Sequence, residues 1–271
     1  MCDRQNPQGY GQFYEQFDSP LMQQLRQQAY GEDIGQHSWV TAQELAEDIA
    51  RLHLSPNSHL LDLGCGPCGP LTFIVGQVGC RATGLDSTPE AVTAGQVRAA
   101  SLGLAERIAL RHADLNQTLP FPNATFDDVI AIDVILHLED RQALFQEVAR
   151  VLVKGGKFLF TDAGVLTGAI SNEQVRRRAA HGYTQFVSPG FTERSLSVAG
   201  MRLLEQQDRT ASLLKNAAGR IAARQAHRAE LEKLEGSDGF ERQQAYLETV
   251  VALSQSGTLS RIMYLAEVPS T

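Results

Sequence analysis

The chain has 271 residues, 43% of them hydrophobic and 20% charged, an ordinary globular composition that excludes collagen, coiled-coil and disordered proteins. Its formal net charge of −7 argues against a nucleic acid or an anionic membrane surface as a partner, because neither attracts an acidic protein over long range. The polar amino terminus, the lack of an apolar run of roughly 18 residues and the low count of four cysteines favour a cytoplasmic protein.

Two helices are expected before the main domain, at residues 20–30 and 41–52. In the second, Thr41 and Glu44 have the spacing of a capping box, and apolar residues recur at helical spacing. We treat residues 1–57 as an N-terminal helical segment.

From residue 58 the pattern alternates between strand and helix. Strands are expected at 59–63, 81–86, 108–112, 126–133 and 157–161, and helices at 70–78, 89–102 and 139–151. Strands that alternate with helices predict an α/β fold with a parallel sheet covered on both faces.

The pattern changes after the fifth strand. Further elements are expected as helices at 172–180 and 192–199 and strands at 202–208 and 258–268. Two long helices, at 211–234 and 240–253, lie between the last two strands with a turn at 236–239, and they are too long for a hairpin loop. We therefore divide the chain into a core of residues 58–210 and 258–271 and a helical cap of residues 211–257.

A glycine turn follows the first strand. Gly64, Gly66 and Gly69 have the G-x-G-x-x-G spacing that lets a ligand approach the backbone, and Asp62 stands two residues before the first glycine. A carboxylate there attracts the ammonium or sulfonium end of a cationic ligand and repels a pyrophosphate. The alternative is a plain strand–turn–helix junction.

Acidic residues also end the second and third strands. Asp86 is placed to accept hydrogen bonds from both hydroxyls of a ribose, or is a solvated surface acid. Asp114 is placed to accept from the amino group of an adenine, with Leu115 beside the ring, or caps a turn. Ligands of such sheets bind at the carboxyl ends of the strands, so we expect these side chains at one edge.

Together, these motifs and the run 126–130 resemble class I S-adenosylmethionine-dependent methyltransferases over roughly residues 58–163. The resemblance implies a Rossmann-like, seven-stranded, mostly parallel sheet with an antiparallel last strand. It also implies S-adenosyl-L-methionine as cofactor and S-adenosyl-L-homocysteine as product. The family usually has glycine where Cys68 stands, so the turn must tolerate a small side chain.

The segments 30–35, 133–137 and 257–259 are similar to small-molecule N-methyltransferases of the sarcosine/dimethylglycine and phosphoethanolamine type. This resemblance implies that His137 lies beside the transferred methyl group, as a catalytic base or only as a hydrogen-bonding residue, and that the N-terminal segment closes over the cofactor. The implied cofactor-binding residues are Tyr30, Gln36, Asp62, Gly64, Cys65, Gly66, Asp86, Ser87, Asp114, Leu115 and Asp133.

Methyl transfer to a small molecule is the favoured function, with nitrogen preferred to oxygen and oxygen to carbon as the acceptor atom. The alternatives are a nicotinamide-dependent oxidoreductase and a cofactor-binding protein without catalysis. We expect a monomer or homodimer, with no membrane, nucleic-acid or metal partner; Cys65-x-x-Cys68 lacks a second ligand pair.

Several other side chains have two interpretations. The stripe Arg220, Arg224 and Arg228 is a solvated face or a clamp for an acidic substrate, and the triplet 176–178 is too short for a nucleic-acid patch in an acidic protein. Aromatic side chains near the amino terminus either pack internally or cap the pocket: Tyr10, Tyr14, Tyr30 and Trp39.

Overall fold

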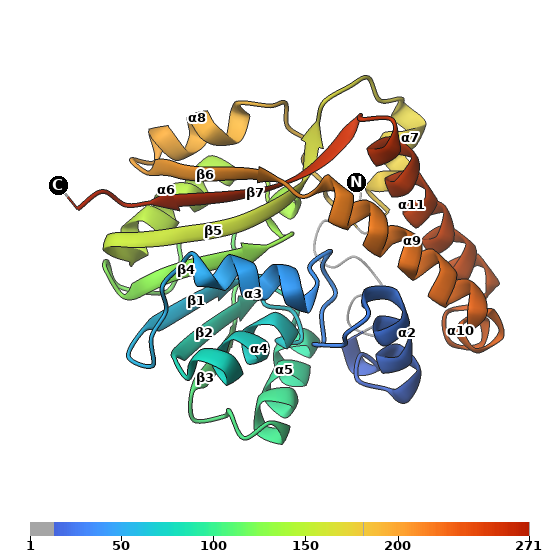
Figure 1. Cartoon of the computed structure of the whole chain (residues 1–271), viewed down its shortest axis with the longest axis horizontal. Helices are drawn as coiled ribbons and strands as arrows, with labels where there is room; N and C mark the ends of the chain where they lie inside the picture. Colours follow the sequence, from blue (N-terminus) through green and yellow to red (C-terminus); the bar gives the residue numbers. More distant parts are fainter. Residues whose placement is uncertain (1–13, 181, 271) are drawn as a thin grey trace.

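The computed structural model describes residues 14–180 and 182–270. The strands are β1 (His59–Leu63), β2 (Arg81–Asp86), β3 (Ile108–His112), β4 (Phe126–Ile132), β5 (Leu152–Leu166), β6 (Arg202–Asp208) and β7 (Leu259–Glu267). They form one sheet in the order β3-β2-β1-β4-β5-β7-β6 (Figure 1). Strands β1 to β5 pair in parallel, whereas β7 is antiparallel to both of its neighbours. The predicted α/β fold with an antiparallel last strand is confirmed.

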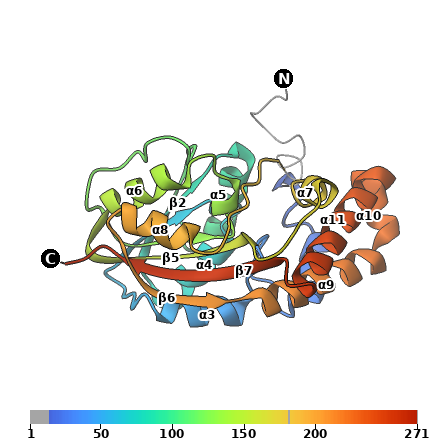
Figure 2. The same cartoon turned by 90° about the horizontal axis from the view of Figure 1, so that it is seen from above.

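Helices cover both faces of this sheet because successive strand residues point to opposite sides. Leu60 packs with α3 (Ala42–Ala50), α4 (Gly69–Val78) and α5 (Pro89–Ser101). Its neighbour Leu61 packs with α6 (Arg141–Val151) and α8 (Phe191–Val198) on the other face. Figure 2 shows α3 on one side of the sheet and α6 and α8 on the other. The two apolar cores explain why the central strands are nearly continuous runs of apolar residues.

The remaining helices gather at one end of the molecule (Figure 1). They are α2 (Pro20–Tyr30), α7 (Asn172–Arg178), α9 (Thr210–Ala226), α10 (Arg228–Glu235) and α11 (Ser237–Gln255). A short 3-10 helix, η1 (Ile135–His137), follows β4. A separate apolar cluster joins α2 to the three helices between β6 and β7: Leu25, Ala29, Tyr30, Ala223, Leu231 and Phe240. The N-terminal helix therefore packs directly on the segment predicted as the cap.

The largest differences from the expected boundaries lie in the segment predicted as the cap and in β5. The helix expected at 211–234 breaks at His227, whose backbone leaves the helical region (φ −111°, ψ 26°) and whose imidazole contacts Gln28 of α2 at 3.3 Å. The turn expected at 236–239 is the first turn of α11. Strand β5 is longer than the expected 157–161 at both ends: it begins at Leu152, which pairs with Phe126 across a register shift, and it ends at Leu166, which pairs with Leu259.

Within residues 14–180 and 182–270, no helix is both long and apolar enough to cross a membrane. The predicted packing residue Tyr10 lies outside the described residues.

Candidate active site

The glycine turn after β1 is as tight as its sequence predicts. Gly64 and Gly66 have positive φ angles of 71° and 52°. The backbone N–H groups of Gly64 and Cys65 both donate to the carbonyl of Leu85, at 2.8 and 2.9 Å, which fixes the turn to the end of β2. A Cβ at Gly64 would lie 2.4 Å from the Val134 side chain, so glycine is required there for packing as well as for conformation.

Asp62 and Asp86 are buried beside this turn, 3% and 9% exposed. In the part of the chain that the structure describes, no hydrogen bond reaches the Asp62 carboxylate. Burial, and then the charge of Asp86, raise the pKa of Asp62 well above its ordinary value. A buried carboxylate without a partner is costly, which indicates a site for a cationic group.

Asp86 has a different environment. Its carboxylate accepts from the backbone N–H groups of Gly66 and Thr88, at 2.8 and 2.9 Å. Burial raises the pKa of Asp86, and these two hydrogen bonds oppose the rise. A carboxylate has about four acceptor positions, so two remain for other donors. One free carboxylate and one half-occupied carboxylate, next to an open backbone turn, fit the ammonium group and the ribose hydroxyls of S-adenosyl-L-methionine.

The loop before α3 packs directly on the glycine turn. A Cβ at Gly69 would lie only 2.0 Å from the carbonyl oxygen of Gly35, and one at Gly66 would lie 3.8 Å from the Tyr14 hydroxyl. Gln36 braces this loop: its side chain accepts from Ile34 N at 2.9 Å and donates to the carbonyl of Glu32 at 2.9 Å. The N-terminal segment and the predicted cofactor turn therefore form one structural unit.

Tyr30 also holds this segment in place. Its hydroxyl donates to the carbonyl of Ser38 at 2.8 Å. Burial raises the pKa of Tyr30, and the charges of Arg220 and Asp133 act on it in opposite directions. Gln36 thus uses its polar atoms within the N-terminal segment, whereas Tyr30 also bonds to Arg220 of α9. The predicted contact of both residues with the cofactor stays a prediction.

Four other predicted residues lie at the carboxyl ends of β1 to β3. Cys65 is buried, and a Cβ at Gly84 would lie 2.8 Å from its sulfur. Ser87 is exposed. Asp114 is exposed and accepts from the backbone and side chain of Asn116 at 2.9 and 3.0 Å, which makes it a turn cap. Leu115 belongs to the main core. Asp114 keeps free acceptor positions, so its two interpretations are compatible.

Asp133 is held by three protein donors. Its carboxylate accepts from Trp39 N at 2.9 Å, from the Thr161 hydroxyl at 2.9 Å and from Arg261 Nε at 2.8 Å. Arg261 is 0% exposed and also forms an ion pair with Glu44 of α3. Asp133 therefore ties β4, β5, β7 and the N-terminal segment together, which supports a positioning role.

His137 ends η1, close to Asp133 in the sequence. Its Nδ1 lies 2.9 Å from the carbonyl oxygen of Tyr183. Because a carbonyl only accepts, Nδ1 is the protonated nitrogen of the neutral ring and Nε2 carries the lone pair. Burial lowers the pKa of His137, against the hydrogen bond to Tyr183, which raises it. The imidazole is therefore neutral and able to accept a proton at neutral pH.

Two arginines in this region were missed by sequence reasoning. Arg261 interrupts an apolar strand, and that isolated charge was the available signal of a buried ion pair. Arg178 ends a triplet that was considered only as a nucleic-acid patch; Arg176 and Arg177 are exposed, but Arg178 is 3% exposed. No periodic pattern distinguishes it from its neighbours.

The basic stripe of α9 and α10 is only partly the solvated face that was favoured. Arg224 is paired with Glu235 and also bonds to Gln244. Arg220 lies over the Trp39 ring, with its Cζ 4.9 Å from the ring centroid.

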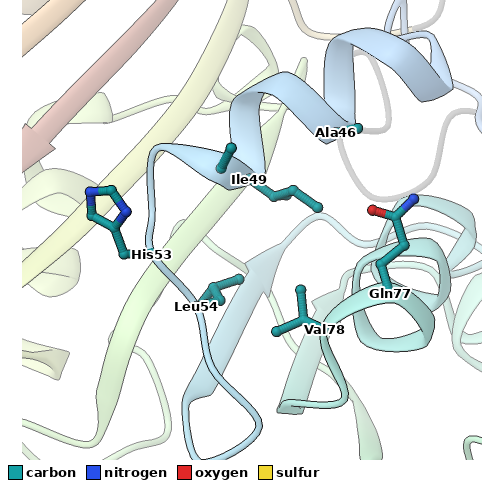
Figure 3. A pocket seen from close by; sticks show the side chains of 7 residues that line it. Ala46, Ile49, His53, Leu54, Gln77 and Val78 are labelled. Atoms are coloured by element: carbon teal, nitrogen blue, oxygen red, sulfur yellow. The ribbon is translucent and has the colours of Figure 1, made fainter.

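A surface hollow of about 330 Å³ lies between α3 and α4, at the end of α4 that is far from the glycine turn (Figure 3). It is lined by Ala46, Ile49, Ala50, His53, Leu54, Gln77 and Val78. None of these residues belongs to the site described above.

Comparison with known proteins identifies the class. Residues 61–160 match the family described as "Methyltransferase domain". The chain is 34% identical over 112 residues to sterol 4-C-methyltransferase strm-1 of Caenorhabditis elegans, a match that covers 41% of this chain and 33% of that protein. It is 30% identical over 177 residues to glycine/sarcosine/dimethylglycine N-methyltransferase of Actinopolyspora halophila, a match that covers 65% of this chain and 31% of that protein. The chain spans only 33% to 49% of the length of the first three curated relatives.

Solved structures share the fold over most of the chain. Phosphoethanolamine N-methyltransferase 2 of Haemonchus contortus superposes with a TM-score of 0.80 at 17% identity, covering 95% of this chain and 59% of that one. The [4+2]-cyclase SpnF superposes with a TM-score of 0.75 at 20% identity, covering 96% of each. Residues 61–160 therefore match a methyltransferase domain, and the chain has the class I S-adenosylmethionine-dependent methyltransferase fold.

Proposed function

We propose that this chain transfers a methyl group from S-adenosyl-L-methionine to a small molecule, with an amine nitrogen as the preferred acceptor and S-adenosyl-L-homocysteine as the product. The observation that carries this proposal is the Asp62 carboxylate, buried and without a hydrogen bond from the described residues, next to the glycine turn. The match of residues 61–160 to a methyltransferase domain supports the same reaction. When bound, the cofactor supplies an electrophilic methyl group.

The residues of the chain hold the two reactants. Asp62 accepts from the ammonium group of the methionine end, and Asp86 accepts from the ribose hydroxyls with the positions that Gly66 and Thr88 leave free. Asp114 is placed at the next strand end for the adenine amino group. The N-terminal segment, residues 1–57, closes over the cofactor, and the cap, residues 211–257, encloses the acceptor and excludes water.

His137 is the proposed catalytic base. An amine attacks only when it is unprotonated, so a proton must leave the acceptor, and neutral Nε2 of His137 receives it. A hydroxyl acceptor has the same need. The curated relatives carry the names of carbon, oxygen and nitrogen methyltransferases, so the preference for nitrogen rests on the resemblance of segments 30–35, 133–137 and 257–259 rather than on them. Oxygen is the second choice and carbon the third.

Two rival functions are separable by binding and turnover. A nicotinamide-dependent oxidoreductase needs a pyrophosphate beside the turn, which the Asp62 charge repels. A cofactor-binding protein without methyl transfer is supported by one neighbour of this fold, named a cyclase rather than a methyltransferase. We propose a cytoplasmic location because the described cysteines, Cys65, Cys68 and Cys80, are buried free thiols. A monomer or a homodimer fits the proposal.

The experiment pairs calorimetry with a turnover screen. S-adenosyl-L-methionine and S-adenosyl-L-homocysteine are expected to bind and NAD is not. A labelled-methyl screen over amines, phenols and carboxylates is expected to find an amine acceptor. Binding of NAD but not of S-adenosyl-L-methionine would favour the oxidoreductase. Binding of S-adenosyl-L-methionine without methyl transfer to any acceptor would favour the non-catalytic cofactor-binding protein.

A further inference from the structure

The buried arginines among the described residues have acid partners, with one exception. The described residues include four buried arginines, Arg26, Arg141, Arg178 and Arg261. Arg26 is paired with Asp33, Arg141 with Asp162, and Arg261 with Asp133 and Glu44. Among residues 14–180 and 182–270, no carboxylate lies within 4.0 Å of the Arg178 guanidinium. Arginine does not lose its proton in proteins, so Arg178 is an unneutralised buried positive charge.

The neighbours of Arg178 are neutral. Nη1 donates to the Tyr246 hydroxyl at 3.2 Å, and Nη2 donates to the carbonyl of Ala163 at 3.1 Å. Nε is buried and has no hydrogen-bond partner among the described residues. The carbonyl and the phenol accept from two of the guanidinium nitrogens but do not neutralise its charge. A bound anion would both neutralise the charge and accept from the remaining N–H groups.

A second arginine without an acid partner lies in the same region. The Trp39 and Tyr246 rings are stacked, with centroids 6.4 Å apart and an interplanar angle of 25°. Arg178 lies 5.4 Å from the Tyr246 centroid and Arg220 lies 4.9 Å from the Trp39 centroid. No described carboxylate lies within 4.0 Å of Arg220. The aromatic pair therefore has an unpaired positive charge at each of its rings.

This positive region adjoins the proposed base. Ala163, which accepts from Arg178, follows Asp162 in β5, and a Cβ on the next residue, Gly164, would lie 3.1 Å from Leu136, the neighbour of His137. Burial is the main cause of the lowered pKa of His137, and the charge of Arg178 lowers it further. A group held by Arg178 would thus lie on the acceptor side of the site, away from Asp62 and Asp86.

We propose that Arg178 binds a carboxylate or phosphate of the methyl-acceptor substrate, and that Arg220 adds a second positive charge at the far ring of the Trp39–Tyr246 pair. This inference rests on the proposed function and narrows its substrate class. With a nitrogen acceptor, the substrate is a small zwitterion or amino-substituted anion. The anion orients the molecule so that its nitrogen lies beside His137.

The first test measures anion binding to the full chain saturated with S-adenosyl-L-homocysteine. Acetate and inorganic phosphate are titrated separately in chloride-free buffer, by calorimetry and by the side-chain nitrogen resonances of arginine. Wild-type protein is expected to bind at least one of the two anions, with a shift of the Arg178 resonance. Arg178→Met is expected to weaken that binding by about 10- to 100-fold, as loss of a charge-assisted hydrogen bond does.

A matched control is available on the same helix. Arg177 is exposed and is paired with Glu173, so Arg177→Met makes the same chemical change without touching the proposed site. It is expected to bind both anions as the wild type does. Equal weakening in both variants, or no anion binding by the wild type, would overturn the proposal. Arg178→Lys replaces Arg178→Met in this test if Arg178→Met is too unstable to measure. Lysine keeps the charge, so Arg178→Lys is expected to retain part of the anion binding.

Turnover separates this inference from the proposed function. Acceptor pairs that differ only in the anion, such as an amino acid and its amide, are compared in the presence of labelled cofactor. The anionic member is expected to have the lower KM, and Arg178→Met is expected to remove that preference. Turnover of only the neutral members would overturn the substrate assignment while methyl transfer stands. If the wild type does not bind the cofactor, the proposed function itself is contradicted.

Discussion

Arg261 of β7 and Asp133, which follows β4, form an ion pair with Nε and Oδ1 2.8 Å apart and with both side chains at most 5% exposed. Glu44 of α3 binds the other arm of the same guanidinium. Burial alone lowers the pKa of Arg261, but the charges of Asp133 and Glu44 outweigh it and the net shift is upward. This triad is the polar centre that fixes the N-terminal segment to the sheet.

Replacing Arg261 by Met is therefore expected to be strongly destabilising. The change leaves two buried carboxylates without their common partner, and the expected loss in free energy of unfolding is about 3–5 kcal/mol, measured by urea denaturation. Arg202→Met serves as a control, because the Arg202 side chain is 66% exposed and its pair with Glu267 lies at the surface. That control is expected to lose less than about 1 kcal/mol. Similar losses in the two variants would mean that the triad has no special role.

Two glycines of α4 make a second comparison. A Cβ at Gly69 would lie 2.0 Å from the carbonyl oxygen of Gly35, whereas a Cβ at Gly76 meets nothing within 4 Å. Gly69→Ala is expected to push the N-terminal loop off the turn and to weaken cofactor binding by at least about tenfold. Gly76→Ala is expected to leave binding unchanged and to stabilise the helix by about 0.5–1 kcal/mol. Unchanged cofactor affinity in Gly69→Ala would show that the loop contact does not matter for binding.

Cys68 stands where the family usually has glycine, and it adopts a left-handed backbone conformation with φ 67°. That conformation costs a non-glycine residue about 1–2 kcal/mol, and burial of the Cys68 side chain in the apolar core, with its Cβ against Gly95 of α5, offsets part of the cost. Cys68→Ala loses the sulfur and keeps the strain, so it is expected to be less stable than Cys68→Gly in thermal and urea unfolding. The reverse order would mean that the backbone strain is negligible.

His137 is expected to affect turnover rather than cofactor binding. His137→Ala is expected to reduce kcat by about 10²- to 10⁴-fold, the usual contribution of a general base, with little change in the dissociation constant for S-adenosyl-L-methionine. His59→Ala, at the opposite end of β1, is the control and is expected to keep kcat. An equal loss of turnover and affinity in His137→Ala would contradict the role of a base.

The pH dependence of turnover tests the same assignment. Burial lowers the pKa of His137 below its ordinary value, so Nε2 stays unprotonated at neutral pH. The rate is expected to be constant through neutral pH and to fall only when the pH drops below about 6.5, as the imidazole gains its proton. If the rate already falls above pH 7 as the pH is lowered, His137 is not the base.

The order of strands and helices along the chain was more predictable from the sequence than the contacts of the buried polar side chains. Strands β1 and β2 end as expected because their apolar runs stop at acidic residues and glycine turns, which are local signals. The break at His227 was not predicted; it lies where His227 contacts Gln28, a residue distant in the sequence, and no glycine or proline marks it. Arg178 was not predictable as a buried residue, since its burial depends on Tyr246 and Ala163.

Asp62 links stability to the proposed ligand. Its pKa is raised in the folded protein by burial and by Asp86, so the folded state holds the proton more tightly than the unfolded state. The free energy of unfolding without cofactor is therefore expected to fall as the pH rises through the range between the unfolded and folded pKa values. Asp62→Asn removes this charge, and its stability is expected to decline less steeply with pH in urea titrations.

Calorimetric titration of S-adenosyl-L-methionine into the wild type and Asp62→Asn tests the central claim. We expect the wild type to bind and Asp62→Asn to bind about 10- to 100-fold more weakly, because the ammonium group loses a charged acceptor. The surface variant Asp238→Asn is expected to bind as the wild type does. A wild-type chain that does not bind, or an Asp62→Asn variant with unchanged affinity, would contradict the assignment of this buried carboxylate to the cofactor.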